Sequence, residues 1–166
     1  MTNEEPAFKP LTRERILSEP RGPAWQLVTD PANLKNLTWS PGVYAHVTRE
    51  HGIVLYVGSG IYENKGVRGR VRDELMWVKR IRDGSEGPHV AQENLLAGLA
   101  AHDFETWVAP TDSVEEALGW ECYFQGLSWL VNRRLLPLRG WSKSIAYGGD
   151  WALDLLEQQR KPTRDE

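Results

Sequence analysis

The sequence predicts an α+β domain in which a small antiparallel sheet of about three strands is flanked by helices. Two neighbouring stretches, 43–47 and 53–57, alternate in side-chain character with the period of two that is typical of strands. A third stretch of β-favouring residues follows at 104–108. By contrast, 67–82 and 114–134 carry apolar residues at helical spacing, so we expect them to cover the sheet.

The first two predicted strands form a hairpin that carries two tyrosines. A turn is predicted between them at 49–52. In an antiparallel pair, residues directly opposite one another point to the same face. If Tyr44 lies opposite Tyr56, the two phenols are neighbours on one face, with His46 beside them; a slip of one residue would separate them. The simpler alternative is a pair of tyrosines that only packs the sheet.

The predicted helix at 67–82 carries charge on its apolar side. At about 100° per residue, Arg70 falls at the edge of the apolar stripe and Glu74 falls inside it. Charged residues four positions apart can form a simple surface ion pair. Against a core face, however, each charge requires a partner, because an unpaired buried charge is costly.

Positive charge is concentrated around the same helix. The chain of 166 residues has a net charge of −3, yet 65–82 contains seven Lys or Arg and only two acidic residues. A solvated charged face is one explanation. Contacts to the phosphates of a nucleic acid are the other, and the candidate nucleic-acid-binding residues are Lys65, Arg68, Arg72 and Lys79.

Two tripeptides and the helix behind them resemble the GIY-YIG nuclease superfamily. Gly42-Val43-Tyr44 and Tyr56-Val57-Gly58 are separated by eleven residues and precede a helix with an inward arginine. The resemblance implies that the tripeptides lie on paired strands. It also implies that Arg70, three residues after the apolar Val67, is the family's arginine.

The resemblance covers only part of the chain. It implies a nuclease-like domain at 41–136, preceded by an N-terminal extension, 1–40, that packs on the domain. The remaining residues, 137–166, are expected to form a C-terminal extension with a short helix and a frayed tail.

The last long predicted helix carries an acidic residue on a buried side. Ser113 and Glu116 form a capping box at its start, and the helix is apolar on most sides. Glu121 therefore needs a proton, a partner such as Arg70, or a metal ion. The resemblance implies a divalent metal bound by one glutamate on a late helix, for which Glu121 is the best match and Glu116 the second.

The resemblance implies a metal-dependent endonuclease that hydrolyses phosphodiester bonds in DNA. Glu121 would bind Mg²⁺, or another divalent cation such as Mn²⁺, and Arg70 would bind the nonbridging oxygens. Tyr44 and Tyr56 would share the proton transfer, with His46 as a helper. An unperturbed phenol pKa of about 10 leaves roughly one tyrosine in a thousand ionised at pH 7, so nearby positive charge would be needed.

Two departures from the family pattern support an alternative. Glu74 occupies the place where members often carry His or Tyr, so it would bind metal, hold Arg70 or mark altered activity. Many members carry an asparagine after the glutamate helix, but 135–140 has none and Asn132 comes too early. The alternative function is a catalytically inactive domain that binds nucleic acid or a partner. The eight tryptophans and the negative net charge suit a third possibility, a structural domain.

The expected compartment and partners of the protein follow from three features that the sequence lacks: a membrane span, a secretory signal and a second cysteine. No apolar run is long enough for a membrane span, and the N-terminus lacks the apolar core of a secretory signal. The single Cys122 rules out an intramolecular disulfide and a cysteine metal cluster. We therefore expect a cytoplasmic protein that acts on DNA, without a membrane partner. A homodimer is one possible source of selectivity, because no separate DNA-binding module is visible.

Overall fold

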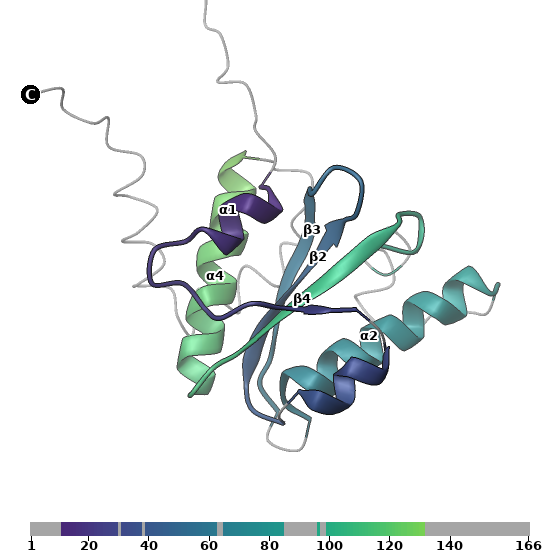
Figure 1. The fold of residues 1–166 in the computed structure, drawn as a ribbon, viewed down its shortest axis with the longest axis horizontal. Coiled ribbons are helices and arrows are strands. Elements are labelled where there is room, and N and C mark those ends of the chain that lie inside the picture. Colours follow the sequence, from purple (N-terminus) through teal and green to yellow (C-terminus); the bar gives the residue numbers. More distant parts are fainter. Residues whose placement is uncertain are drawn as a thin grey trace, which may run out of the picture.

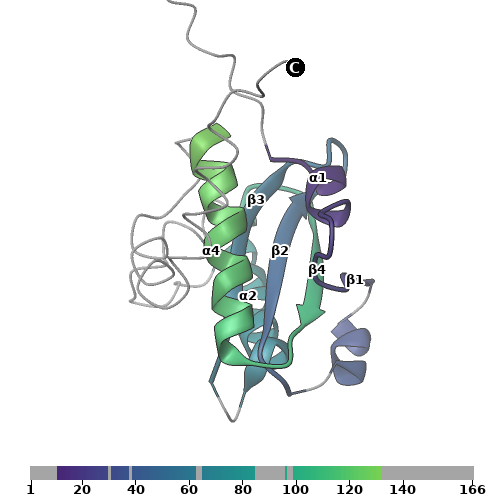
Figure 2. The ribbon, with the colours of Figure 1, turned by 90° about the vertical axis from the view of Figure 1, so that its left-hand side faces the viewer.

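The structure, a computed structural model, describes residues 11–29, 31–37, 39–62, 65–84, 96 and 99–131. Four antiparallel strands form one sheet in the order β1-β4-β2-β3, which Figure 2 shows across the sheet. The strands are β1 (Gln26–Val28), β2 (Gly42–Thr48), β3 (Val54–Gly60) and β4 (Phe104–Pro110). The predicted α+β class is confirmed, and the sheet has one strand more than expected.

Helices cover both faces of this sheet. Figure 1 shows α2 and α4 on opposite sides of the strands. The short helix η1 packs beside α2, and the core on the opposite face joins α1 to α4. The helices are α1 (Arg13–Leu17), η1 (Pro31–Asn36), α2 (Gly66–Arg82) and α4 (Val114–Val131). None of the helices in the described ranges is long and apolar enough to cross a membrane.

The additional strand comes from the segment before residue 41. β1 pairs with β4, with Leu27 opposite Trp107. At the opposite edge of the sheet, Thr12 forms an isolated bridge with Ile53, just before β3. The N-terminal segment is therefore part of the sheet and its core.

The hairpin register differs by two residues from direct opposition of the tyrosines. Tyr44 lies opposite Gly58, and His46 lies opposite Tyr56. A shift of two keeps both phenols on one face, so the expected common face is confirmed while the direct pairing is wrong. β3 also continues to Gly60, three residues beyond the predicted strand end at 57.

The register explains the glycines of both tripeptides. A Cβ added at Gly58 would overlap the Tyr44 hydroxyl and would lie 2.6 Å from Tyr44 Cζ. A Cβ at Gly42 would lie 2.8 Å from Val67 Cγ1 on α2. Any side chain at these positions would push the phenol or the helix away from the sheet.

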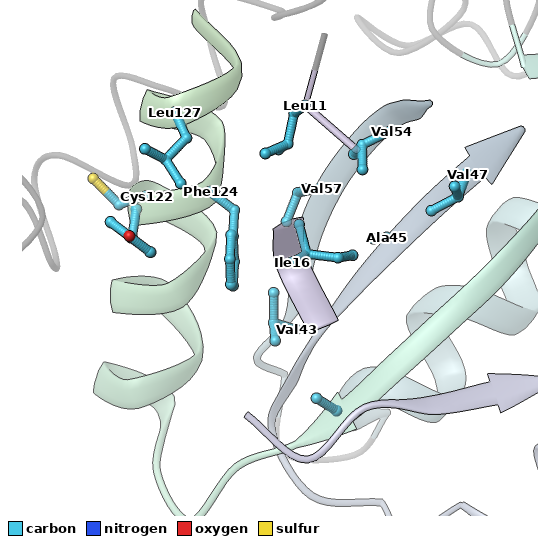
Figure 3. Close-up of a cluster of buried hydrophobic side chains, with 12 residues drawn as sticks. Leu11, Ile16, Val43, Ala45, Val47, Val54, Val57, Cys122, Phe124 and Leu127 are labelled. Carbon is cyan, nitrogen blue, oxygen red and sulfur yellow. The ribbon is translucent and has the colours of Figure 1, made fainter. Parts of the chain in front are cut away.

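The larger apolar core lies between the sheet and α4. Figure 3 shows side chains of β2 and β3 meeting α4 and the N-terminal segment. The strands contribute Val43, Ala45, Val47, Val54 and Val57, and their partners include Leu11, Ile16, Cys122, Phe124 and Leu127. The predicted burial of α4 is confirmed for this part of the helix.

The start of α4 shows one half of the predicted capping box. Ser113 Oγ accepts a hydrogen bond from the Glu116 N–H at 3.1 Å. Glu116 Oε2 instead accepts from the Asp112 N–H at 3.1 Å, one residue before the expected donor. The predicted helix beyond residue 131, Asn132, the 135–140 region and the 137–166 extension lie outside the described residues.

Candidate functional site

A buried carboxylate lies at the centre of the sheet face under α2. Glu74 is only 2 % exposed, as its place in the apolar stripe predicts. Its Oε2 accepts a hydrogen bond from the Tyr44 hydroxyl and forms an ion pair with Arg70 Nε, which lies 3.1 Å away. Its Oε1 lies 3.3 Å from His46 Nε2. These donors stabilise a charge that would otherwise be expensive to bury.

His46 links this carboxylate to the neighbouring strand β4. Because Nε2 faces the Glu74 carboxylate, the arrangement fits a proton on Nε2. Nδ1 then accepts from the Thr106 hydroxyl at 2.9 Å. His46 is fully buried and packs between the rings of Tyr56 and Phe104. Its role is therefore to orient Glu74, and Thr106 joins the site as a residue that the sequence did not single out.

The two phenols lie close together and are kept neutral. Their ring centroids are 6.1 Å apart, and Tyr44 is fully buried while Tyr56 is 7 % exposed. Burial first, and then the Glu74 carboxylate, raises the pKa of both hydroxyls, although Arg70 opposes the shift. At neutral pH both tyrosines are therefore hydrogen-bond donors rather than phenolate bases.

Arg70 is the cation of the site and reaches solvent. Burial lowers its pKa, but the nearby Tyr44 and Glu74 more than offset this, so the pKa is raised and the charge is kept. Nε contacts Glu74 and, at 3.5 Å, the Tyr44 hydroxyl. Among the described residues, neither Nη group of Arg70 has a hydrogen-bond partner. The outer side of the fork can therefore bind an anion.

Glu121 lies on the other side of the edge strand β3. Ser59 Oγ donates to its Oε2 at 2.6 Å, and Gln125 Nε2 lies 3.3 Å from its Oε1. Ser59 is adjacent to Gly58 in the strand and so faces α4 rather than α2. The structure thus brings Tyr44, Tyr56, His46 and Arg70 together and places Glu121 apart from them.

Glu121 still interacts with the tyrosine cluster on the other side of β3. The Glu121 carboxylate helps to raise the pKa of Tyr56, after burial and Glu74. Glu74 rather than Glu121 forms the ion pair with Arg70. Three roles were expected for Glu74: binding a metal, holding Arg70 or marking altered activity. The contact present in the structure is the one with Arg70.

The surroundings of Glu121 fit a hard cation with few protein ligands. Within the described ranges, no three or more His, Cys, Asp or Glu residues gather as a metal site. Mg²⁺ needs no such group, because it keeps several waters and often binds one or two carboxylates plus substrate phosphates. Among the described residues, Gln125 Oε1 is buried without a hydrogen-bond donor, and the same side chain contacts Glu121 through Nε2. Glu74, surrounded by donors, does not fit a metal.

The predicted phosphate contacts form a different surface. At about 100° per residue, Arg68, Arg72 and Lys79 lie roughly 160–200° around α2 from Arg70. Lys65 Nζ lies 3.0 Å from the Asp73 carboxylate, and Arg72 Nε lies 3.7 Å from it. These four residues therefore lie on the flank of α2 away from Arg70.

Comparisons with known proteins add no further assignment. The chain has no match among protein-family models, curated proteins or solved structures. The function of this site is therefore inferred from its own residues and from the two tripeptides that carry the resemblance.

Proposed function

We propose that the domain is a metal-dependent endonuclease that hydrolyses phosphodiester bonds in DNA. The observation that carries the proposal is the meeting of Tyr44, Tyr56 and Arg70 on one sheet face. Gly58 makes room for the phenol of Tyr44, which gives the tripeptide glycine a physical reason. This is the arrangement that the resemblance to GIY-YIG nucleases implies.

Arg70 would stabilise the charge of the phosphate. A guanidinium binds two oxygens through its planar fork and stays charged at any working pH. The contacts of Nε to Glu74 and Tyr44 hold the group in one orientation. A preorganised donor of this kind stabilises charge as it develops in the transition state.

The phenols would pass a proton rather than hold it. Tyr56 is the more exposed of the two tyrosines and interacts with Tyr44, and the Tyr44 hydroxyl donates to Glu74. The attacking water can release its proton to Tyr56 as Tyr56 passes its own to Tyr44 and Tyr44 passes its own to Glu74. The proton ends on the carboxylate, so no phenolate has to form.

Glu121 is the group that would hold the cation. When bound, Mg²⁺ supplies a Lewis acid for the leaving oxygen. Ser59 donates to the carboxylate of Glu121 and would keep it oriented.

A plasmid-cleavage assay tests the proposal. The full chain is incubated with supercoiled plasmid and with branched DNA, in Mg²⁺ and in Mn²⁺. We expect cleavage that falls about a hundredfold or more in Arg70→Ala and Glu121→Ala. Arg80→Ala, at an exposed position on the same helix and outside both the site and the candidate phosphate contacts, is the matched control and keeps most activity. Absence of cleavage under all conditions, or equal cleavage by all variants, would refute the proposal.

The second candidate is a domain that binds nucleic acid without cutting it. It is favoured by one observation, the Glu74 carboxylate that neutralises Arg70 and engages Tyr44. Binding that persists in EDTA, with no product in Mg²⁺ or Mn²⁺, would favour this function over the nuclease.

A further inference from the structure

Trp39 is an exposed aromatic residue that the fold holds in a defined place. Its exposed fraction is 46 %, which is large for an indole. The Val67 N–H donates to the Ser40 carbonyl at 3.0 Å and ties this loop to the start of α2. A Cβ at Gly66 would collide with the backbone carbonyls of Trp39 and Ser40, so the close approach needs this glycine, whose φ is +55°.

The indole lies directly against the helix. A Cβ at Gly69 would lie 3.5 Å from Trp39 Cζ3, an ordinary contact distance, so the ring lies beside this turn of the helix. The ring is therefore positioned by the backbone of α2, and binding would not have to order it first.

Cations surround this ring. The Arg68 guanidinium lies 4.3 Å from the ring centroid, and that of Arg72 lies 5.9 Å away. Asp73 is the acidic residue that contacts this group, through Lys65 and Arg72. We define the tryptophan–arginine surface as Trp39, Lys65, Arg68, Arg72 and Lys79.

A purely structural role explains this surface poorly. An exposed cation–π contact contributes only about 0.5–1 kcal/mol. An indole that served the core would be covered, as Trp107 and Trp120 partly are in the core under α4. A patch that only attracted phosphates would need the cations but not the ring.

We propose that the tryptophan–arginine surface binds a single-stranded segment of nucleic acid. One unstacked base would lie on Trp39, and Arg68 and Arg72 would hold the phosphates on either side. An aromatic ring set in a basic groove is the arrangement that binds single strands with little sequence preference. A duplex keeps its bases stacked inside, where the indole cannot reach them.

The position of the surface supports a flexible ligand. It lies on the flank of α2 opposite Arg70, so a strand that contacts both has to bend around the helix. Duplex DNA is stiff on this scale, with a persistence length of about 150 base pairs, whereas an unpaired strand bends readily. The inference rests on the proposed function, which makes nucleic acid the ligand. It adds that the substrate has an unpaired segment.

Binding measured without cleavage tests the surface. Fluorescence anisotropy of labelled oligothymidylate, oligouridylate and a blunt DNA duplex of equal length is recorded with the full chain in EDTA. We expect at least one single strand to bind more tightly than the duplex. Trp39→Ala should weaken that binding about 5- to 100-fold, because stacking on the ring is lost.

Two further variants separate stacking from folding. Trp39→Phe keeps an aromatic face and should retain most of the affinity. Leu17→Ala removes an exposed apolar side chain of α1, 41 % exposed and on the other side of the sheet, and should leave binding unchanged. Urea unfolding of each variant shows whether it is folded at the assay conditions.

The outcomes distinguish this surface from the nuclease proposal. Equal binding by Trp39→Ala and the wild type, or a duplex bound as tightly as both single strands, would overturn the inference. Preference for the uridylate over the thymidylate would support it and identify RNA as the source of the strand. Loss of binding in Trp39→Ala with no cleavage by the wild type would refute the nuclease and leave the surface standing.

Discussion

Tyr44 and Gly58 lie directly opposite each other on β2 and β3, and the phenol of the tyrosine extends across the glycine. This contact turns the Tyr44 hydroxyl toward Glu74 on α2. The glycine of the second tripeptide is therefore a space for the tyrosine of the first. A substitution at Gly58 should therefore affect the stability of the fold by displacing the Tyr44 phenol.

Gly58→Ala should destabilise the fold by about 1–3 kcal/mol, because the new methyl group overpacks the sheet face. In a Tyr44→Phe background the cost should fall by about 1 kcal/mol, because the nearest atom, the hydroxyl, is absent. Urea unfolding of the two single variants and the double variant gives this coupling. Strictly additive effects would show that the contact is not the cause.

Glu74→Gln should lower the free energy of unfolding by about 1–3 kcal/mol, because an amide cannot accept from all three donors. Asp73→Asn on the same helix is the matched control. Its contacts with Lys65 and Arg72 are at the surface, so the change should be less than about 1 kcal/mol. Equal effects of the two variants in urea unfolding would contradict the central role of Glu74.

The raised pKa values of Tyr44 and Tyr56 predict a loss of stability in alkali. In the unfolded chain these phenols ionise above about pH 10, while in the folded chain they stay protonated. Stability is therefore intact below pH 10 and should fall as pH rises, by about 1.4 kcal/mol per unit for each phenol. Urea midpoints of the Tyr44→Phe/Tyr56→Phe variant should fall less steeply, and an identical slope would argue against buried neutral phenols.

The hairpin and α2 are predictable because their information is local. The alternation around Tyr44 and Tyr56 specifies strands, and the position of Glu74 within an apolar stripe specifies a buried carboxylate. The link from His46 to Thr106 is not local, because it depends on the register between β2 and β4. A polar residue in a strand was the only available signal for it.

The remaining differences also come from non-local packing. β1 is three residues long and pairs with a strand some eighty positions later, so no periodic pattern reveals it. Burial of Glu121 was predictable from the apolar surroundings on α4, but the face of the sheet that α4 covers was not. Trp39 follows η1 outside any regular element, so its exposure depends on the backbone contact with Gly66.

Glu121→Gln should abolish divalent metal binding, because the replacement removes the carboxylate that accepts from Ser59. Mn²⁺ binding measured by electron paramagnetic resonance tests this without relying on cleavage. Glu116→Gln is the matched control on the same helix, since Glu116 is exposed and caps the helix start. Metal binding lost in Glu116→Gln but kept in Glu121→Gln would move the site to the start of α4.

Arg70→Lys should lower the cleavage rate about a hundredfold while leaving Mn²⁺ binding unchanged. A lysine can pair with Glu74 or contact the phosphate, but its single ammonium group cannot do both as the guanidinium can. Arg80→Lys, at an exposed position of the same helix outside the site and the tryptophan–arginine surface, should cleave within a few-fold of the wild type. Initial rates of plasmid nicking give the comparison. A rate in Arg70→Lys that equals that of Arg80→Lys would mean that only the charge of residue 70 matters, and that the fork held by Glu74 and Tyr44 plays no part.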